Sequence, residues 1–407
     1  MKRLFAGLVA LAIGCQPDAG PGRVSGPISA SPSVAHAEEL ASTGWQATAA
    51  NLVAQNLFSP IASGRIYSLV CVAQNWAVQN ADESGGDDEE DGGEGRGRLD
   101  AERGAVAGAS AVVLSFFVPA QTQALEDMVS AQRNAARSPD AFARGEAAGR
   151  AAGAAIVTRA QTDGFTNPFT GTIPTGPGLW ISNTTPPTIA AGSLPGTRPW
   201  FLTSASQFRS GPPPAFGSTD FLTALAEIRQ ISDTRTAQQE QIAAYWALNP
   251  GTIGPVGFWL HVATDGITTH GYSERRATHL YALLSATMFD AQIACWDAKE
   301  TYWFIRPWQA DPLISVLAAV GKPNHPSYPS GHSCVSSSAG AVLSKFFPEQ
   351  RDALNAMVIE AGLARMYGGI HYRFDIEAGQ QIGRSVAAFT LQADKSHHSV
   401  LSVDDDE

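Results

Sequence analysis

Apolar residues recur at helical spacing over most of the chain. Between residues 38 and 81 they fall three and four positions apart, as from Trp45 to Leu57, which predicts amphipathic helices. The same spacing returns across 101–162 and again from 219 to about 393. Alternating strand patterns are scarce, so the pattern predicts an all-α fold.

Two segments interrupt the predicted helices. Residues 163–217 are crowded with Pro, Gly, Thr and Ser, which predicts a long surface loop of the kind that often builds the mouth of an active site. ESGGDDEEDGGEGRG at 83–97 predicts an acidic loop, and a solvated insertion is favoured over a divalent-cation site because the carboxylates lack calcium-loop order. We therefore predict an N-terminal helical region at 38–217, a C-terminal helical catalytic domain at 218–393 and an acidic tail at 394–407.

Residues 1–37 are typical of an export leader followed by a tether. The opening MKR supplies positive charge, and LFAGLVALAIG at 4–14 is apolar but short for a bilayer span. Cleavage before Cys15 would leave a lipidated cysteine, whereas cleavage after Ala37 would release a secreted chain. The long distance from the apolar stretch to Ala37 favours the lipoprotein site. Both routes place the protein outside the cytoplasm, in a bacterial periplasm or cell envelope, or secreted.

Composition and charge limit the classes of binding partner that we expect. The run at 104–120 is weakly hydrophobic and ends at a proline, so a buried helix is favoured over a membrane span, and Cys15 is the one membrane anchor we expect. The net charge of −11 argues against nucleic acid, because no basic surface is offered to phosphates. Cys71, Cys295 and Cys334 match neither a disulfide framework nor a metal-ligand spacing, and the first two are predicted core residues. No pattern predicts the oligomeric state.

A pair of cations follows a long predicted helix over 275–299. Lys299 and Arg306 are seven residues apart, close to two helical turns, so both should project from nearly the same face. The apolar YWFI between them would bury the segment, and buried cations need an anion as partner. Asp290 is stranded among apolar residues of the same helix. We expect it either to pair with a site cation or to form a helix–helix hydrogen bond.

The stretch HPSYPSGHS at 325–333 predicts an anion site. Its prolines fix an extended approach, so Ser330, Gly331 and His332 would lie at a helix N-terminus, where free amides and the helix dipole favour negative charge. Gly331 also lets an anion approach the backbone without a Cβ in the way. Taken alone, Pro-Ser-Gly is more typical of a common turn than of an anion site.

A third pattern, ARMYGGIHYRFDIEAG, occupies 364–379. Arg365 is predicted near a helix end, and His371 is predicted to open the next helix after a Gly-Gly break. Asp375 follows four residues later on the same face, so its carboxylate can hold one imidazole nitrogen protonated. The other nitrogen would then point outward as a nucleophile or a metal ligand.

These three patterns taken jointly make the chain resemble one superfamily. That superfamily contains the type-2 phosphatidic acid phosphatases, the bacterial non-specific acid phosphatases and the vanadium-dependent haloperoxidases. The resemblance covers roughly 295–380 and, more loosely, the helices from about 219. It implies a helical bundle of the acid phosphatase/haloperoxidase type with long Pro/Gly-rich surface loops. The third motif usually begins Ser-Arg, and Ala364 here removes one hydroxyl near the site. The motifs are Lys299-x6-Arg306-Pro307, Pro329-Ser330-Gly331-His332 and Arg365-x5-His371-x3-Asp375.

The resemblance implies an oxyanion cage. Three cations would neutralise the equatorial oxygens of a bound phosphate or vanadate, assisted by one hydroxyl and one backbone amide. These groups belong to Lys299, Arg306, Arg365, Ser330 and Gly331.

The same resemblance assigns the remaining polar residues of the motifs. His371 would either attack phosphorus or bind vanadium, and Asp375 would orient it. His332 would be the general acid/base on the opposite side of the anion. One cage therefore suits both phosphoryl transfer and vanadate chemistry.

Several features favour the haloperoxidase branch. Trp296, three residues before Lys299, and the motif HPSYPSGH resemble that branch most closely. There the position five residues before the cage serine lies close to the halide, and a histidine at it, as His325 is here, accompanies bromide or iodide oxidation. A turn histidine bonded to backbone is the alternative for His325. The chain also lacks the several membrane spans of the lipid phosphatases and is longer than the compact acid phosphatases.

The function implied is that of a vanadate-dependent haloperoxidase, which uses hydrogen peroxide to oxidise halide to hypohalous acid. One alternative is a phosphomonoesterase that cleaves phosphate esters through a phosphohistidine at His371. The other is a non-catalytic envelope lipoprotein that binds phosphate.

Overall fold

The structure is a computed structural model that describes residues 40–83, 94–395 and 399–402. Within these ranges the regular structure is helical, and one isolated antiparallel bridge joins Leu179 to Phe304. The predicted all-α class is therefore confirmed. The predicted leader and tether, with Cys15 and Ala37, lie outside the described residues.

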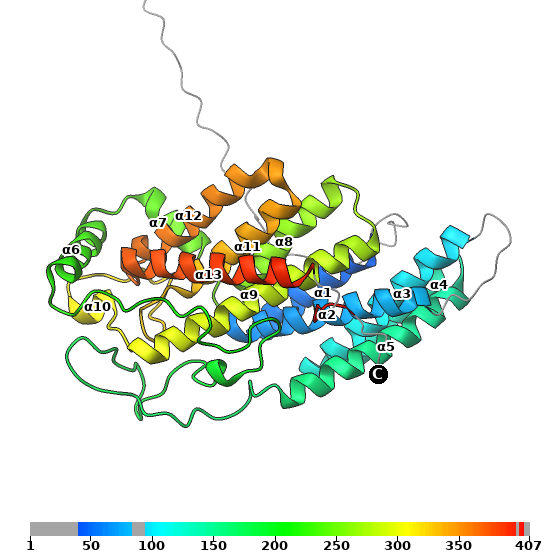
Figure 1. Ribbon diagram of the computed structural model, residues 1–407, viewed down its shortest axis with the longest axis horizontal. Helices are drawn as coiled ribbons and strands as arrows, with labels where there is room; N and C mark the ends of the chain where they lie inside the picture. Colours follow the sequence, from blue (N-terminus) through cyan, green and yellow to red (C-terminus); the bar gives the residue numbers. More distant parts are fainter. Residues whose placement is uncertain (1–39, 84–93, 396–398, 403–407) are drawn as a thin grey trace, which may run out of the picture. The chain divides into compact units, whose positions relative to one another are not determined.

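Thirteen α-helices occur in the described part of the chain, and Figure 1 shows their arrangement. They are α1 (Ala41–Gln55), α2 (Pro60–Glu83), α3 (Glu94–Phe117), α4 (Thr122–Ala135), α5 (Pro139–Thr162), α6 (Thr219–Thr234), α7 (Ala237–Tyr245), α8 (Gly254–Thr269), α9 (Glu274–Tyr302), α10 (Pro307–Ala310), α11 (Gly331–Phe346), α12 (Arg351–Tyr367) and α13 (Arg373–Ala393). Three short 3-10 helices are η1 (Pro119–Gln121), η2 (Leu194–Gly196) and η3 (Pro348–Gln350).

The predicted helical regions are confirmed, with one difference at the acidic loop. Helix α3 begins at Glu94, so the last residues of the predicted loop 83–97 are helical, while 84–93 lie outside the described residues. Packing against α5 reaches this end of α3, because a Cβ at Gly97 would lie 4.0 Å from the Cβ of Ala141. Tertiary contact thus extends a helix into a sequence that is typical of a loop.

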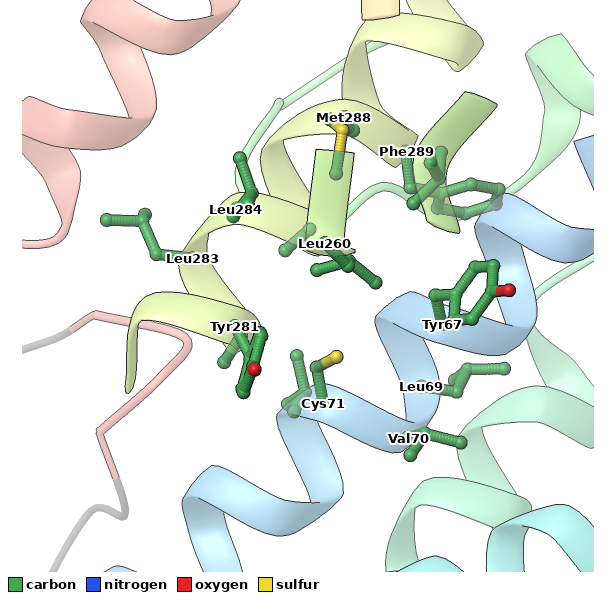
Figure 2. Close-up of a cluster of buried hydrophobic side chains, with 14 of the residues drawn as sticks. Tyr67, Leu69, Val70, Cys71, Leu260, Tyr281, Leu283, Leu284, Met288 and Phe289 are labelled. Carbon is green, nitrogen blue, oxygen red and sulfur yellow. The ribbon is translucent and has the colours of Figure 1, made fainter. Parts of the chain in front are cut away.

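One apolar core is shared by the N-terminal and C-terminal helices. Tyr67 and Cys71 of α2, Leu260 of α8, and Leu284 and Met288 of α9 are buried in one cluster (Figure 2). The sequence regions 38–217 and 218–393 therefore contribute to the same core. The predicted core positions of Cys71 and Cys295 are confirmed, since both side chains are fully buried.

The start of the predicted acidic tail folds back onto α2. Leu401 is buried, and its carbonyl accepts hydrogen bonds from Asn75 Nδ2 at 2.9 Å and from Gln79 Nε2 at 2.8 Å. Residues 399–402 therefore belong to the packed body, while 396–398 and 403–407 lie outside the described residues.

The apolar run at 104–120 lies mostly in α3, where Ala105, Ala109 and Leu114 are buried against neighbouring helices. This burial confirms the predicted core helix. Among the described residues, no helix has both the length and the apolar character needed to cross a membrane.

The long loop 163–217 is fixed to α9 by a buried carboxylate. Both oxygens of Asp290 accept backbone hydrogen bonds, from Trp200 at 2.8 Å, Phe201 at 2.8 Å and Leu202 at 3.1 Å. Both expectations for Asp290, a site cation or a helix partner, were therefore wrong. A carboxylate in a dry helix face can satisfy three amide groups of an irregular segment, and this arrangement orders the loop.

Helices α3 and α5 lie side by side (Figure 1), and their backbones touch. A Cβ at Gly145 would lie 1.8 Å from the carbonyl oxygen of Ala101, and one at Gly104 would lie 2.0 Å from that of Phe142. The glycines at this interface are needed for close approach of the two helices, because backbone atoms of the facing helix occupy the positions that their Cβ atoms would take. Backbone atoms cannot rotate away as a side chain can.

We expect Gly145→Ala to lower the free energy of unfolding by about 1–3 kcal/mol, because overpacking forces two helices apart. Gly44→Ala is the matched control in α1. Gly44 is exposed and a Cβ there meets nothing within 4 Å, so this change should raise stability by up to about 1 kcal/mol through helix propensity. Urea unfolding of both variants measures the effect. Equal stability of the two variants would show that the α3–α5 contact is not close.

Candidate active site

The three predicted motifs converge on one cavity of about 470 Å³. Six of the predicted site residues line this cavity directly, and the rest lie buried behind them. The lining residues are Trp296, His325, Gly331, His332, Arg365 and His371. The fully buried residues are Lys299, Arg306, Ser330 and Asp375.

The second motif forms the N-terminus of α11, as predicted. Ser330 is the N-cap residue, and its hydroxyl accepts from Ser333 N at 3.4 Å. Gly331 follows as the first residue of the helix and lines the cavity, where a Cβ would lie 3.3 Å from the ring of Trp296. The glycine therefore keeps this helix end open to a ligand.

The first motif is not arranged as predicted. Helix α9 ends at Tyr302, and Trp303 adopts a left-handed backbone conformation with φ of 48°. Arg306 follows in extended conformation, with φ of −80° and ψ of 154°. Lys299 and Arg306 therefore do not share a helix face, because the chain reverses between them. The expectation from their spacing was wrong, although both side chains reach the same site.

Arg306 contacts two of the three histidines that line the cavity, His371 and His325. Its Nη1 donates to the carbonyl of Ile370 at 2.7 Å and lies 3.1 Å from His371 Nε2. Its Nη2 lies 3.1 Å from His325 Nδ1, and its Nε donates to the His325 carbonyl at 3.0 Å. Burial lowers the pKa of Arg306 to about 10.

Lys299 is held by carbonyl oxygens of the HPSYPSGHS stretch. Its ammonium donates to Pro326 O at 2.8 Å, to Ser327 O at 3.0 Å and to the carbonyl of Pro329. It also lies 5.5 Å from the ring centroid of Trp296. Burial lowers the pKa of Lys299 to about 8, so its positive charge is sensitive to mildly alkaline pH.

His371 is oriented by Asp375, although it lies before α13 and not inside it. The helix begins at Arg373, and His371 Nδ1 lies 2.8 Å from Asp375 Oδ2. A guanidinium can only donate, so His371 Nε2 accepts from Arg306 and the proton resides on Nδ1, facing Asp375. The predicted arrangement of one protonated and one available nitrogen is therefore present.

Asp375 is itself held by groups that the sequence analysis did not single out. Its Oδ2 also accepts from the Ser327 hydroxyl at 2.5 Å and from Tyr372 N at 3.1 Å. Burial raises the pKa of Asp375 to about 6, and the hydrogen bond from Ser327 opposes that rise. Ser327 lies inside the motif between two prolines, and a hydroxyl at that place was the signal available in the sequence.

His332 and Arg365 present polar atoms that need a partner. His332 Nε2 and Arg365 Nε are buried and make no hydrogen bond to any described residue. Arg365 Nη2 donates to the carbonyl of Ala243 at 3.1 Å. Burial lowers the pKa of Arg365 to about 9, and burial together with the Arg365 charge lowers that of His332 well below its ordinary value.

This chemistry fits a tetrahedral or trigonal oxyanion. Buried donors without partners are costly in a folded protein, and an oxyanion in the cavity would satisfy Arg365 Nε while it faces the amide end of α11. His371 and His332 both line the same space. The residues present therefore suit vanadate or phosphate.

His325 packs against Trp296 on the cavity wall, with ring centroids 4.9 Å apart and the ring planes tilted by 45°. Its Nδ1 also lies 3.2 Å from the carbonyl of Pro326, so the backbone contact expected of a turn histidine is present together with the Arg306 contact. Burial and the charges of Lys299 and Arg306 lower the pKa of His325 well below its ordinary value. The indole Nε1 of Trp296 donates to Ala190 O at 3.0 Å, which brings the long loop to the site.

We expect the affinity of the cavity for sulfate to fall as pH rises above about 8. The pKa of Lys299 is lowered, so the ammonium loses its proton in that range and the attraction for an anion weakens. Sulfate does not itself titrate there. Titration calorimetry between neutral and alkaline pH measures the affinity.

Lys299→Arg is the matched control, because a guanidinium stays charged. It should move the loss of sulfate affinity to higher pH. An unchanged alkaline limb in this variant would contradict the assignment of the limb to Lys299.

The segment that contains the site is similar to known proteins. Residues 278–398 match the model of the PAP2 superfamily. A non-specific acid phosphatase of Providencia stuartii is 28% identical over 204 residues, which are 48% of this chain and 77% of that protein. Among solved structures, the first bacterial vanadium-dependent iodoperoxidase is similar with a TM-score of 0.72 and 24% identity, over 86% of this chain and 95% of that one.

The apo form of a bacterial vanadium-dependent chloroperoxidase is similar with a TM-score of 0.67 and 14% identity, over 83% of this chain and 95% of that one. These structural likenesses show that the fold is shared. The segment 278–398 that matches the PAP2 superfamily contains all three motifs, and these motifs assemble around one cavity.

Proposed function

We propose that this chain is a vanadate-dependent haloperoxidase that oxidises halide with hydrogen peroxide to hypohalous acid, with bromide or iodide favoured. One observation carries the proposal: His325 lies against Trp296 and Arg306 in the cavity that also contains His371. The chain thus has a third imidazole beside the anion site, in addition to His371 and His332, which phosphate-ester cleavage does not require. The similarity in fold to an iodoperoxidase supports this choice.

Six residues would hold vanadate in the cavity. His371 Nε2 would be the ligand, and the charges and donors around it would neutralise the oxygens. These surrounding groups belong to Lys299, Arg306, Arg365, Ser330 and Gly331. Vanadate, when bound, supplies a Lewis acid that activates peroxide.

His332 would handle protons on the opposite side from His371. Burial and Arg365 keep it neutral, and its Nε2 has no partner among the described residues. It can therefore accept a proton from hydrogen peroxide that enters the cavity and return one to the product. This role needs a lowered pKa, because a protonated imidazole could not act as a base.

His325 would hold the halide. Nδ1 faces both the Arg306 guanidinium and the Pro326 carbonyl, and in the tautomer in which Nδ1 accepts from Arg306 the proton is on Nε2, which can donate to the halide. A neutral N–H beside the edge of Trp296 gives a large polarisable halide both a donor and an apolar contact. The cationic Arg306 behind it adds attraction for negative charge.

A phosphomonoesterase is the second candidate, and the similarity to a non-specific acid phosphatase favours it. His371 Nε2 is unprotonated, so it could attack a phosphate ester and form a phosphohistidine. His332 would then have to be protonated to donate to the leaving alcohol, and its lowered pKa disfavours that state. A non-catalytic phosphate-binding protein is the third outcome to be tested.

We also propose that the protein acts outside the cytoplasm, anchored through a lipid on Cys15. The mass of the mature chain distinguishes the two cleavage sites. A chain that begins at a lipidated Cys15 is expected, and a chain that begins at Glu38 without lipid would replace this proposal with secretion.

The purified protein should brominate or iodinate a phenolic dye when it is given vanadate, hydrogen peroxide and the halide. The vanadate-free protein should release little p-nitrophenol from p-nitrophenyl phosphate. Robust phosphate release without halogenation would replace the haloperoxidase with the phosphatase. Failure of both assays across the pH range would leave a binding protein.

Two histidine variants test the assignment of roles in the same experiment. His371→Ala should abolish tight vanadate binding, measured by equilibrium dialysis, because it removes the ligand. His332→Ala should retain vanadate and lose turnover by about 10²–10⁴-fold, the usual contribution of a general acid/base. Equal loss of vanadate in both variants would overturn the assignment.

A further inference from the structure

The cavity has a cation where it opens to solvent. Lys322 is exposed and also lines the cavity that contains His325 and His371. In the part of the chain that the structure describes, no carboxylate forms an ion pair with its ammonium group. The three cationic residues of the cage are buried, so Lys322 is the charge that an anion approaching from solvent would meet first.

The backbone under Lys322 is anchored to the long loop. Its carbonyl accepts from Asn183 Nδ2 at 2.9 Å, and the side chain of Asn324 accepts from Asn183 N at 2.7 Å. Asn324 also donates to Thr188 O at 3.0 Å, and its carbonyl accepts from Ala190 N at 2.8 Å. The position of Lys322 is thus fixed three residues before His325, while its long side chain keeps its freedom.

The charge of the cavity wall is opposite to that of the whole chain. The sequence contains 38 acidic and 27 basic residues. Among the described residues that line the cavity, none is Asp or Glu, and the formally charged ones are Lys322 and Arg365. A hollow lined with one sign of charge concentrates counter-ions and raises their rate of arrival.

We propose that Lys322 recruits small inorganic oxyanions and halides into the cavity, and that it speeds their association without taking part in the chemistry. The inference rests on the proposed function for the identity of these anions, vanadate and halide. Lys322 is a recruiting residue because its ammonium group reaches solvent and makes no hydrogen bond to a cage residue.

The test measures vanadate association with the full-length protein by stopped-flow tryptophan fluorescence, since Trp296 lines the cavity. Lys322→Gln should lower the association rate constant by about two- to fivefold at low salt, and Lys322→Glu should lower it further. Lys322→Arg should keep the wild-type rate. The dissociation rate should not change in any of these variants.

Lys345→Gln is the matched control, because it changes the net charge equally at an exposed position of α11 that does not line the cavity. It should bind vanadate at the wild-type rate. The difference between Lys322→Glu and wild type should shrink as salt rises, since the screening length at 0.1 M is about 10 Å.

Three results would overturn the inference: a wild-type association rate in Lys322→Glu, an equal loss in Lys345→Gln, or a loss that salt does not reduce. Inorganic phosphate, followed in the same way, serves as the second anion. If neither anion binds the wild-type protein, the inference is also wrong. Association that depends on Lys322 without any halogenation would uphold the inference while rejecting the haloperoxidase, so the two failures are distinguishable.

Discussion

The structure of the site depends on three cations buried from water. Lys299, Arg306 and Arg365 are all at most 1% exposed, and moving such charges out of water costs several kcal/mol each without compensation. Backbone carbonyls supply much of that compensation, three of them from the HPSYPSGHS stretch to Lys299 alone. A segment can offer its carbonyls in this way only when no helix or strand uses them. The extended approach predicted from its prolines is not what the structure shows, because the stretch bends at residues 327–329 and the Tyr328–Pro329 peptide bond is cis. The prolines instead keep the stretch out of a regular helix, so that its carbonyl oxygens stay available as acceptors.

Helix α9 connects the buried cations to the long loop. This helix carries Lys299 and Trp296 toward the cavity, and six residues before Trp296 it carries Asp290, which accepts hydrogen bonds from three amides of the long loop. The loop in turn accepts a hydrogen bond from the Trp296 indole at the carbonyl of Ala190. A segment whose composition is typical of a mobile surface loop is thus a fixed wall of the site. Because its anchor is a buried carboxylate, whose pKa burial raises to about 6, the wall depends on an ionised group in an apolar helix.

Helix positions and the convergence of the motifs could be predicted from the sequence. Both depend on side-chain identity, through the spacing of apolar residues and through the residue types that bind an anion. The path of the backbone between the motifs could not be predicted from the sequence. The left-handed backbone conformation at Trp303 ends the helix between Lys299 and Arg306. No glycine or asparagine at that position indicates it in the sequence. Carbonyl partners such as those of Ile370 and Ala243 have no side-chain signature at all. Asp290 was visible as an anomaly, but its partners lie about ninety residues earlier in an irregular segment.

Arg306 joins the anion site to the proposed halide position. Its Nε and one terminal nitrogen are fixed by the carbonyls of His325 and Ile370, whereas its contacts to the ring nitrogens of His371 and His325 can be exchanged. When His371 Nε2 turns to a ligand, the guanidinium can redirect that hydrogen bond to the ligand without moving, because two carbonyl contacts still hold it. The same charge stays in contact with His325. The anion site and the proposed halide position therefore share one cation, so a cage suited to phosphate or vanadate can hold a third imidazole, that of His325, through the same guanidinium.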